Sequence, residues 1–138
     1  MDTTVTKKIF VNGTFDILHR GHLVLLSVAK SLGDTLLVCI DSDERVKSLK
    51  GKTRPINNQA DRAFFLDSLK AVDSVKIFHS DAELESIIKE YHPYVMVKGS
   101  DYKDKPIIGE QYCDNIVLIP LIESYSTTNV IKHITNRR

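Results

Sequence analysis

Residues 9–22 read IFVNGTFDILHRGH, and this stretch decides the fold. Its apolar start, Ile9-Phe10-Val11, closes in Asn12-Gly13, which is typical of a buried strand that ends in a turn. From about Arg20 to Leu32, apolar side chains recur at helical spacing, and Gly33 then ends the helix. The chain therefore opens with a strand, a glycine-containing loop and an amphipathic helix.

The alternation of strand and helix continues along the chain. Further buried strands are predicted over residues 35–40, 75–78, 94–97 and 115–119. Polar residues that can cap helices stand at 41–43, 57–58, 80–81 and 126–128. Strands that alternate with helices form a parallel sheet through right-handed crossovers. We therefore expect an α/β fold, in which helices cover both faces of a parallel sheet of about five strands.

Size and charge restrict the classes of function. The 138 residues fit a single domain, which we expect to span residues 1–138. Lysines and arginines number 19 and acidic residues 18, so there is no basic excess that would indicate nucleic-acid binding. The apolar runs are too short to span a bilayer, and no apolar leader follows Met1. We expect a cytoplasmic protein that binds neither nucleic acid nor membrane.

Three polar loops follow predicted strands, over residues 13–22, 98–102 and 120–128. The carboxyl ends of parallel strands meet at one edge of a sheet, and ligands bind there in α/β folds. We therefore expect these loops to share a ligand site. Gly13 has no side chain, so the backbone of the first loop can approach a ligand closely.

His19 and His22 lie three residues apart at the start of the first predicted helix, on neighbouring faces of one turn. A helix N-terminus presents free N–H groups and the positive end of a dipole, and both favour phosphate. Two imidazoles there can donate hydrogen bonds to phosphate oxygens. A metal-binding pair and a helix cap are the alternative interpretations. The glycine between the histidines and the Gly-Thr-Phe-Asp turn before them favour the phosphate interpretation.

Cationic side chains lie in a second loop and in the helix after it. Lys50, Lys52 and Arg54 surround Gly51 in a loop that can close over a pyrophosphate or an acceptor phosphate. A solvated surface loop is the alternative interpretation. Arg62 lies in the next predicted helix, where it forms either a surface ion pair or a contact with the ligand.

Polar residues near the last two strands complete the set of candidates. Lys98 and Asp101 directly follow a buried strand, which favours a ligand role over a simple turn. Ser126 is expected to cap the last helix, and the N–H groups of that turn suit a triphosphate, so Thr127 and Thr128 are candidate ligands. An attacking phosphate is already anionic and needs no general base. A structural or metal-linked role is therefore favoured for Asp16.

The motifs resemble those of the cytidylyltransferase-like nucleotidyltransferase superfamily. The Gly-Thr-Phe-Asp and His-x-Gly-His signatures lie within residues 13–22, and the similarity continues in family order through residues 50–57, 61–62, 97–102 and 125–129. Within the superfamily, the chain is most similar to the adenylyltransferase domain of bacterial heptose-phosphate enzymes, which act on ADP-heptose precursors. The combination of motifs is specific, whereas each short motif alone is not.

The resemblance implies a Rossmann-like domain in which a substrate phosphate oxygen attacks the α-phosphorus of a nucleoside triphosphate and pyrophosphate leaves. It implies Mg²⁺ as the cofactor, bridging phosphate oxygens, and assigns no metal ligand to this chain. The catalytic residues would be His19, His22, Lys52 and Lys98. The nucleotide would contact Gly13, Thr14, Phe15, His19, His22, Lys98, Asp101, Ser126, Thr127 and Thr128. The acceptor would contact Asp16, Lys50, Lys52, Arg54 and Arg62.

The resemblance leaves the base and the acceptor open. Glycerol-3-phosphate cytidylyltransferases are similar in the first and last motifs, but they carry Arg-Thr-Glu-Gly where this chain has Leu121-Ile122-Glu123-Ser124. The missing arginine and the segment 98–102 favour ATP over CTP. A heptose 1-phosphate is the expected acceptor, with another sugar phosphate or glycerol phosphate as alternatives. A non-catalytic nucleotide-binding module is the remaining alternative, and the resemblance also suggests a homodimer.

Overall fold

The apolar runs of the sequence form the strands of one parallel sheet. The computed structural model describes residues 5–99 and 104–120. Its strands are β1 (Lys8–Gly13), β2 (Thr35–Asp41), β3 (Ser74–Phe78), β4 (Val95–Gly99) and β5 (Asn115–Ile119). They lie in the order β3-β2-β1-β4-β5, and all neighbouring pairs are parallel. The α/β fold expected from the sequence is confirmed.

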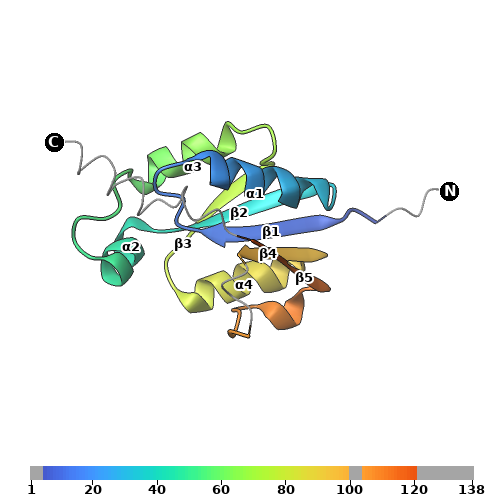
Figure 1. The fold of residues 1–138 in the computed structure, drawn as a ribbon. Helices are drawn as coiled ribbons and strands as arrows, with labels where there is room; N and C mark the ends of the chain where they lie inside the picture. Colours follow the sequence, from blue (N-terminus) through green and yellow to red (C-terminus); the bar gives the residue numbers. More distant parts are fainter. Residues whose placement is uncertain (1–4, 100–103, 121–138) are drawn as a thin grey trace.

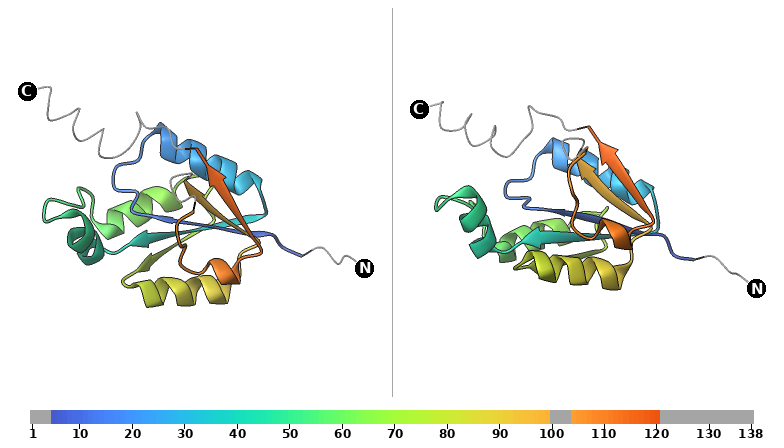
Figure 2. Two further views of the ribbon diagram at one scale, coloured as in Figure 1. Left: turned by 60° about the horizontal axis from the view of Figure 1, so that its bottom comes forward. Right: turned by 90° about the horizontal axis from the view of Figure 1, so that it is seen from below.

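Helices cover both faces of the sheet, as Figure 1 shows. One face carries α1 (Arg20–Ser31) and α3 (Gln59–Asp67), and the other carries α4 (Asp81–Tyr91). The short helix α2 (Asp43–Lys50) lies beyond the carboxyl end of β2. A 3₁₀ helix, η2 (Glu110–Tyr112), precedes β5 and lies beside the end of α4 (Figure 2).

The core lies in two layers, one on each side of the sheet. Leu26 of α1 and Leu66 of α3 pack in the first layer. Leu84 and Ile88 of α4 pack in the second. Because both faces of the sheet are covered, β2 is buried along almost its whole length.

The helix starts follow the capping residues of the sequence. Ser42, Asn58 and Ser80 are the N-caps of α2, α3 and α4, and each side chain accepts a hydrogen bond from the backbone N–H three residues later. The cap expected within 126–128 lies outside the described residues.

Helix α3 does not bury its two phenylalanines. The side chains of Phe64 and Phe65 are exposed, Phe64 by 70%. The face toward the sheet instead carries Arg62 and Leu66, four residues apart on one side of the helix. The turn of η2 was not predicted, because residues 110–112 carry no apolar periodicity.

The winding of the chain reverses at β1. From β1 the chain passes through β2 to β3, and α4 then returns it to β4 on the other side of β1. The carboxyl ends of β1 and β4 therefore lie at a reversal point of the sheet, where ligands bind in such folds. Within the described part of the chain, no helix is long and apolar enough to cross a membrane.

Candidate active site

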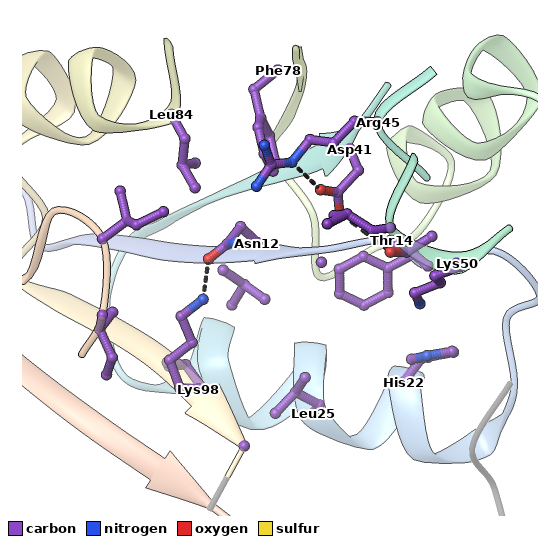
Figure 3. Close-up of a pocket in the computed structure, with 18 of the residues that line it drawn as sticks. Asn12, Thr14, His22, Leu25, Asp41, Arg45, Lys50, Phe78, Leu84 and Lys98 are labelled. Atoms are coloured by element: carbon purple, nitrogen blue, oxygen red, sulfur yellow. Dashed lines mark hydrogen bonds and ion pairs between the residues drawn. The ribbon is translucent and has the colours of Figure 1, made fainter. Parts of the chain in front are cut away.

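A cavity of about 470 Å³ lies at this reversal point (Figure 3). The loop after β1, helix α1, the end of α2 and strand β4 all contribute to its lining. The lining residues that were predicted from the sequence are Gly13, Thr14, Phe15, His22, Lys50 and Lys98. The expectation that residues of separate loops would meet at one edge is confirmed for these positions.

The loop after β1 has an unusual backbone conformation. Phe15 has a φ of 50°, a left-handed conformation that residues other than glycine rarely adopt. Its ring is buried, and its centroid lies 5.1 Å from that of His22. A Cβ atom on Gly13 would lie 3.0 Å from this ring, so only glycine fits there without displacing Phe15. The Phe15 ring thus fixes both the loop and the orientation of His22.

The two histidines cap helix α1. His19 is the N-cap, and its Nδ1 accepts a hydrogen bond from the N–H of Gly21 at 3.1 Å. The Nδ1 of His22 accepts from the N–H of His19 at 3.2 Å, and the two rings stack with centroids 3.8 Å apart. Because Nδ1 is the acceptor, the proton of each neutral ring lies on Nε2. The cap interpretation is therefore correct for Nδ1, and His22, which lines the cavity, retains an Nε2–H donor.

Both imidazoles are held in the neutral form. Burial lowers the pKa of His19. Burial, together with smaller effects of the neighbouring His19 and Lys50, lowers the pKa of His22 to about 4. A neutral His22 at physiological pH can thus accept at Nδ1 and donate at Nε2.

This lowered pKa predicts a pH-dependent loss of stability. The folded state favours neutral His22, so its stabilisation is complete above the ordinary pKa of 6.5 and is lost as the pH falls toward about 4. We expect the melting temperature of the wild type to fall more steeply over this range than that of His22→Asn. Above about pH 7.5 the melting temperatures of the two proteins should change with pH in parallel, because the imidazole is neutral in both the folded and the unfolded state. Equal slopes in acid would contradict the assignment.

Asp16 joins the loop after β1 to the loop before α3. Its buried carboxylate accepts hydrogen bonds from Arg54 Nε at 3.0 Å, from the N–H of Ile56 at 2.9 Å and from the N–H of Asn57 at 2.8 Å. Burial alone would raise the pKa of Asp16, but these hydrogen bonds hold it below its ordinary value. The contacts describe the structural role favoured for Asp16 and give Arg54 a role in the same clamp. Substrate contacts of these two residues stay predictions.

Arg62 is not on the surface. The surface ion pair that the sequence left open is wrong, because the side chain is fully buried. Its guanidinium donates to the backbone oxygens of Asn57, Thr14 and Asp41 at 2.8–3.0 Å and to the Asp43 carboxylate at 2.8 Å. These bonds hold together the loops that follow β1 and β2. In this conformation Arg62 acts on the site by positioning backbone, and a contact of Arg62 with the ligand stays a prediction.

The lysines occupy different places. Lys98 Nζ donates to Asn12 Oδ1 at 2.5 Å across the strand pair β1–β4 (Figure 3). Lys50 faces the cavity, and burial followed by repulsion from Arg54 lowers its pKa. Lys52 is exposed in the loop beyond α2. Asp101, Ser126, Thr127 and Thr128 lie outside the described residues.

Several residues that line the cavity were not predicted from the sequence. Asn12 is the next-to-last residue of β1 and accepts a hydrogen bond from Lys98, while Asp41 ends β2 and accepts one from Thr14 Oγ1 at 3.2 Å. Arg45 stands four residues after Asp41 and donates to it through Nε at 2.8 Å. Phe78 ends β3 beside them. Asp41 and Phe78 could have been found, because Asp41 directly follows a predicted strand and Phe78 ends one, both at the ligand edge.

The geometry can be set beside known proteins. A model of the cytidylyltransferase-like family matches residues 10–133. The chain belongs to the cytidylyltransferase-like family. The match includes β1 from Phe10 onward, both histidines and the other elements of the site described above.

Curated relatives of this family member are considerably longer. Over 128 residues the chain is 48% identical to the bifunctional protein HldE of Aliarcobacter butzleri, covering 93% of this chain and 27% of that protein. It is 47% identical over 133 residues to HldE of Helicobacter hepaticus, covering 96% of this chain and 27% of that protein. The chain thus spans about a quarter of the length of the curated relatives it matches.

Two solved structures share the fold of this chain. The lipopolysaccharide core biosynthesis protein from Thermoplasma volcanium superposes with a TM-score of 0.67 at 24% identity, covering 85% of this chain and 97% of that one. A protein of unknown function from Archaeoglobus fulgidus gives 0.64 at 18% identity, covering 86% and 93%. The expected Rossmann-like architecture is confirmed.

Proposed function

We propose that this chain is a nucleotidyltransferase that joins ATP to a heptose 1-phosphate and releases pyrophosphate. The observation that carries the proposal is the convergence on one cavity of the α1 N-terminus, His22, Lys50 and Lys98. The positive end of the α1 dipole, an imidazole N–H and two ammonium groups suit a cluster of phosphates.

The proposed reaction needs positioning more than proton transfer. A phosphate oxygen of the acceptor attacks the α-phosphorus, a new P–O bond forms, and the bond to the bridging oxygen breaks as pyrophosphate leaves with the electron pair. Negative charge grows on the leaving group. The Nε2–H of His22 and the ammonium of Lys98 would stabilise that charge from fixed positions. The hydrogen bond to Asn12 holds the ammonium of Lys98 beside β1.

The residues present fit a magnesium ion carried by the nucleotide. Within the described residues, no group of three or more His, Cys, Asp or Glu side chains is arranged to hold a metal. Asp16 and Asp41 already accept hydrogen bonds from protein groups. Mg²⁺ prefers octahedral oxygen ligands and is commonly bound through substrate phosphates. We propose that it enters on the triphosphate, where it neutralises charge.

The assignment of the acceptor and of the nucleotide base rests on sequence similarity. The motifs resemble heptose-phosphate adenylyltransferase domains, and the chain is 47–49% identical to relatives named HldE. Release of pyrophosphate should be measured with ATP and with CTP against heptose 1-phosphate, other sugar 1-phosphates and glycerol 3-phosphate. ATP with heptose 1-phosphate should be the fastest pair. The His22→Asn protein, purified in parallel, reports contaminating activity.

Other outcomes of this panel have definite meanings. CTP with glycerol 3-phosphate as the fastest pair would replace the proposal with a cytidylyltransferase. Nucleotide binding without release from any pair would indicate a non-catalytic module.

The nucleotide preference predicts a difference in thermal stability. ATP with Mg²⁺ should raise the melting temperature more than CTP, because a ligand that binds only the folded state stabilises it by about 2.7 kcal/mol at a hundred times its Kd. Inorganic tripolyphosphate, which lacks a base, reports how much of the rise in melting temperature comes from the phosphates alone. Thermal shifts at matched concentrations provide the measurement. An equal or larger shift with CTP would contradict the adenylyl assignment.

A further inference from the structure

A cluster of charged side chains lies across β1 from Lys98 and His22. Figure 3 shows Arg45, Asp41 and Phe78 on one side of β1, and Lys98 and His22 on the other. Arg45 and Asp41 both line the cavity. Neither residue has a role in the mechanism above, so the cluster requires an explanation of its own.

Arg45 is held on three sides. Its Nε donates to Asp41 Oδ1 at 2.8 Å, and one terminal nitrogen donates to Asp81 Oδ1 at 2.5 Å. The guanidinium carbon lies 5.1 Å from the centre of the Phe78 ring. A guanidinium has five N–H donors, and these two bonds use two of them. These contacts fix the guanidinium of Arg45, and its other N–H groups remain beside the cavity.

The charge balance of the cluster disfavours phosphate. Two carboxylates, of Asp41 and Asp81, outweigh the single positive charge of Arg45. An acceptor phosphate would instead be drawn to Lys50 and His22 at the α1 N-terminus. Uncharged hydroxyl groups suit the cluster better, because a hydroxyl can donate to Asp41 and accept from Arg45 at once.

The other side of the cavity has different chemistry. Beside β4 the lining includes Gly99, Pro106, Ile107 and Ile108. Apolar side chains suit the flat face of a nucleotide base, which has few polar groups on its surface. The hydroxyl-rich substrate therefore fits the β2–β3 side.

We propose that Arg45 is a specificity-determining residue that binds hydroxyl groups of the acceptor sugar. Asp41 shares these hydroxyls, and Asp81 is a positioning residue that holds the guanidinium in place. This inference rests on the proposed function, because it assigns the acceptor of that reaction to one side of the cavity. It extends that function by predicting that deoxygenated acceptors are rejected.

Calorimetric titration tests the proposal without turnover. The probes are heptose 1-phosphate, a deoxy analogue of it and inorganic phosphate. In the wild type, heptose 1-phosphate should bind at least about tenfold more tightly than inorganic phosphate. In Arg45→Gln this preference should be lost, while the affinity for inorganic phosphate stays the same. Lys47→Gln, an exposed change on the same helix, is the matched control and should behave as the wild type.

Kinetics supply a second, independent measurement. Arg45→Gln and Asp81→Asn should raise the KM for the sugar phosphate, with a smaller effect for Asp81, and leave the KM for ATP unchanged. Asp81 has a largely exposed side chain, so Asp81→Asn remains informative if Arg45→Gln folds poorly. An unchanged preference for sugar phosphate in both variants, or an effect on ATP alone, would overturn the inference. If the wild type turns over and both variants keep its KM for the sugar phosphate, only this inference is overturned. If the wild type itself shows no turnover, the proposed function is overturned.

Discussion

Replacing His22 with asparagine is expected to lower kcat roughly a hundredfold or more, the scale for loss of one preorganised donor. Asparagine places an oxygen close to the position of Nδ1, so it can still accept the hydrogen bond from the N–H of His19. It has no donor at the position of Nε2. The variant therefore separates the capping role from the phosphate role, which His22→Ala cannot do. Steady-state kinetics and circular dichroism together provide the measurement.

The affinity for ATP should fall much less than kcat. Charge on the leaving pyrophosphate grows only in the transition state, so a donor aimed at it contributes mainly there. His19→Asn is the companion variant, since asparagine is a good N-cap and should preserve α1. A His22→Asn protein with normal kcat and a normal melting temperature would show that His22 only caps the helix.

Replacing Arg62 with methionine is expected to lower the free energy of unfolding by about 3–5 kcal/mol. Methionine fills much of the volume but leaves three backbone oxygens and the Asp43 carboxylate without their donor. Buried acceptors that lose a partner keep the cost of their desolvation. Urea unfolding measures the loss. Lys70→Met, at an exposed position after α3, should change stability by less than about 0.5 kcal/mol.

The same variant tests how Arg62 acts on the site. Arg62→Lys retains the charge but cannot make the forked set of bonds, so it should recover only part of the lost stability. A fully stable Arg62→Met protein with weakened substrate binding would contradict the positioning role and restore the ligand contact expected from the sequence.

The sheet and most of the cavity could be predicted because they depend on local patterns. Apolar runs that end in polar loops gave the strands, and parallel strands bring their carboxyl ends together whatever the details of packing. The capping residues Ser42, Asn58 and Ser80 act within one turn of their own helix. Gly13 and Lys98 therefore met at one cavity as expected.

The remaining features depend on contacts between distant residues. The partners of Arg62 are backbone oxygens at positions 14, 41 and 57, and no residue type in the sequence marks them. Because Arg62 occupies the side of α3 that faces the sheet, Phe64 is left exposed on the outer side. Likewise, Arg45 belongs to the site because Asp81, at the start of another helix, holds it there.

The clamp made by Asp16 restricts how this domain can be re-engineered. Its carboxylate receives donors from Arg54, Ile56 and Asn57, and the Asn57 side chain donates back to the Asp16 carbonyl at 2.7 Å. A chimera that imports residues 51–58 from a relative breaks these bonds unless the imported backbone presents the same donors. The loop after β1, which carries Asp16, and residues 51–58 should therefore be transplanted together when acceptor preference is to be redesigned.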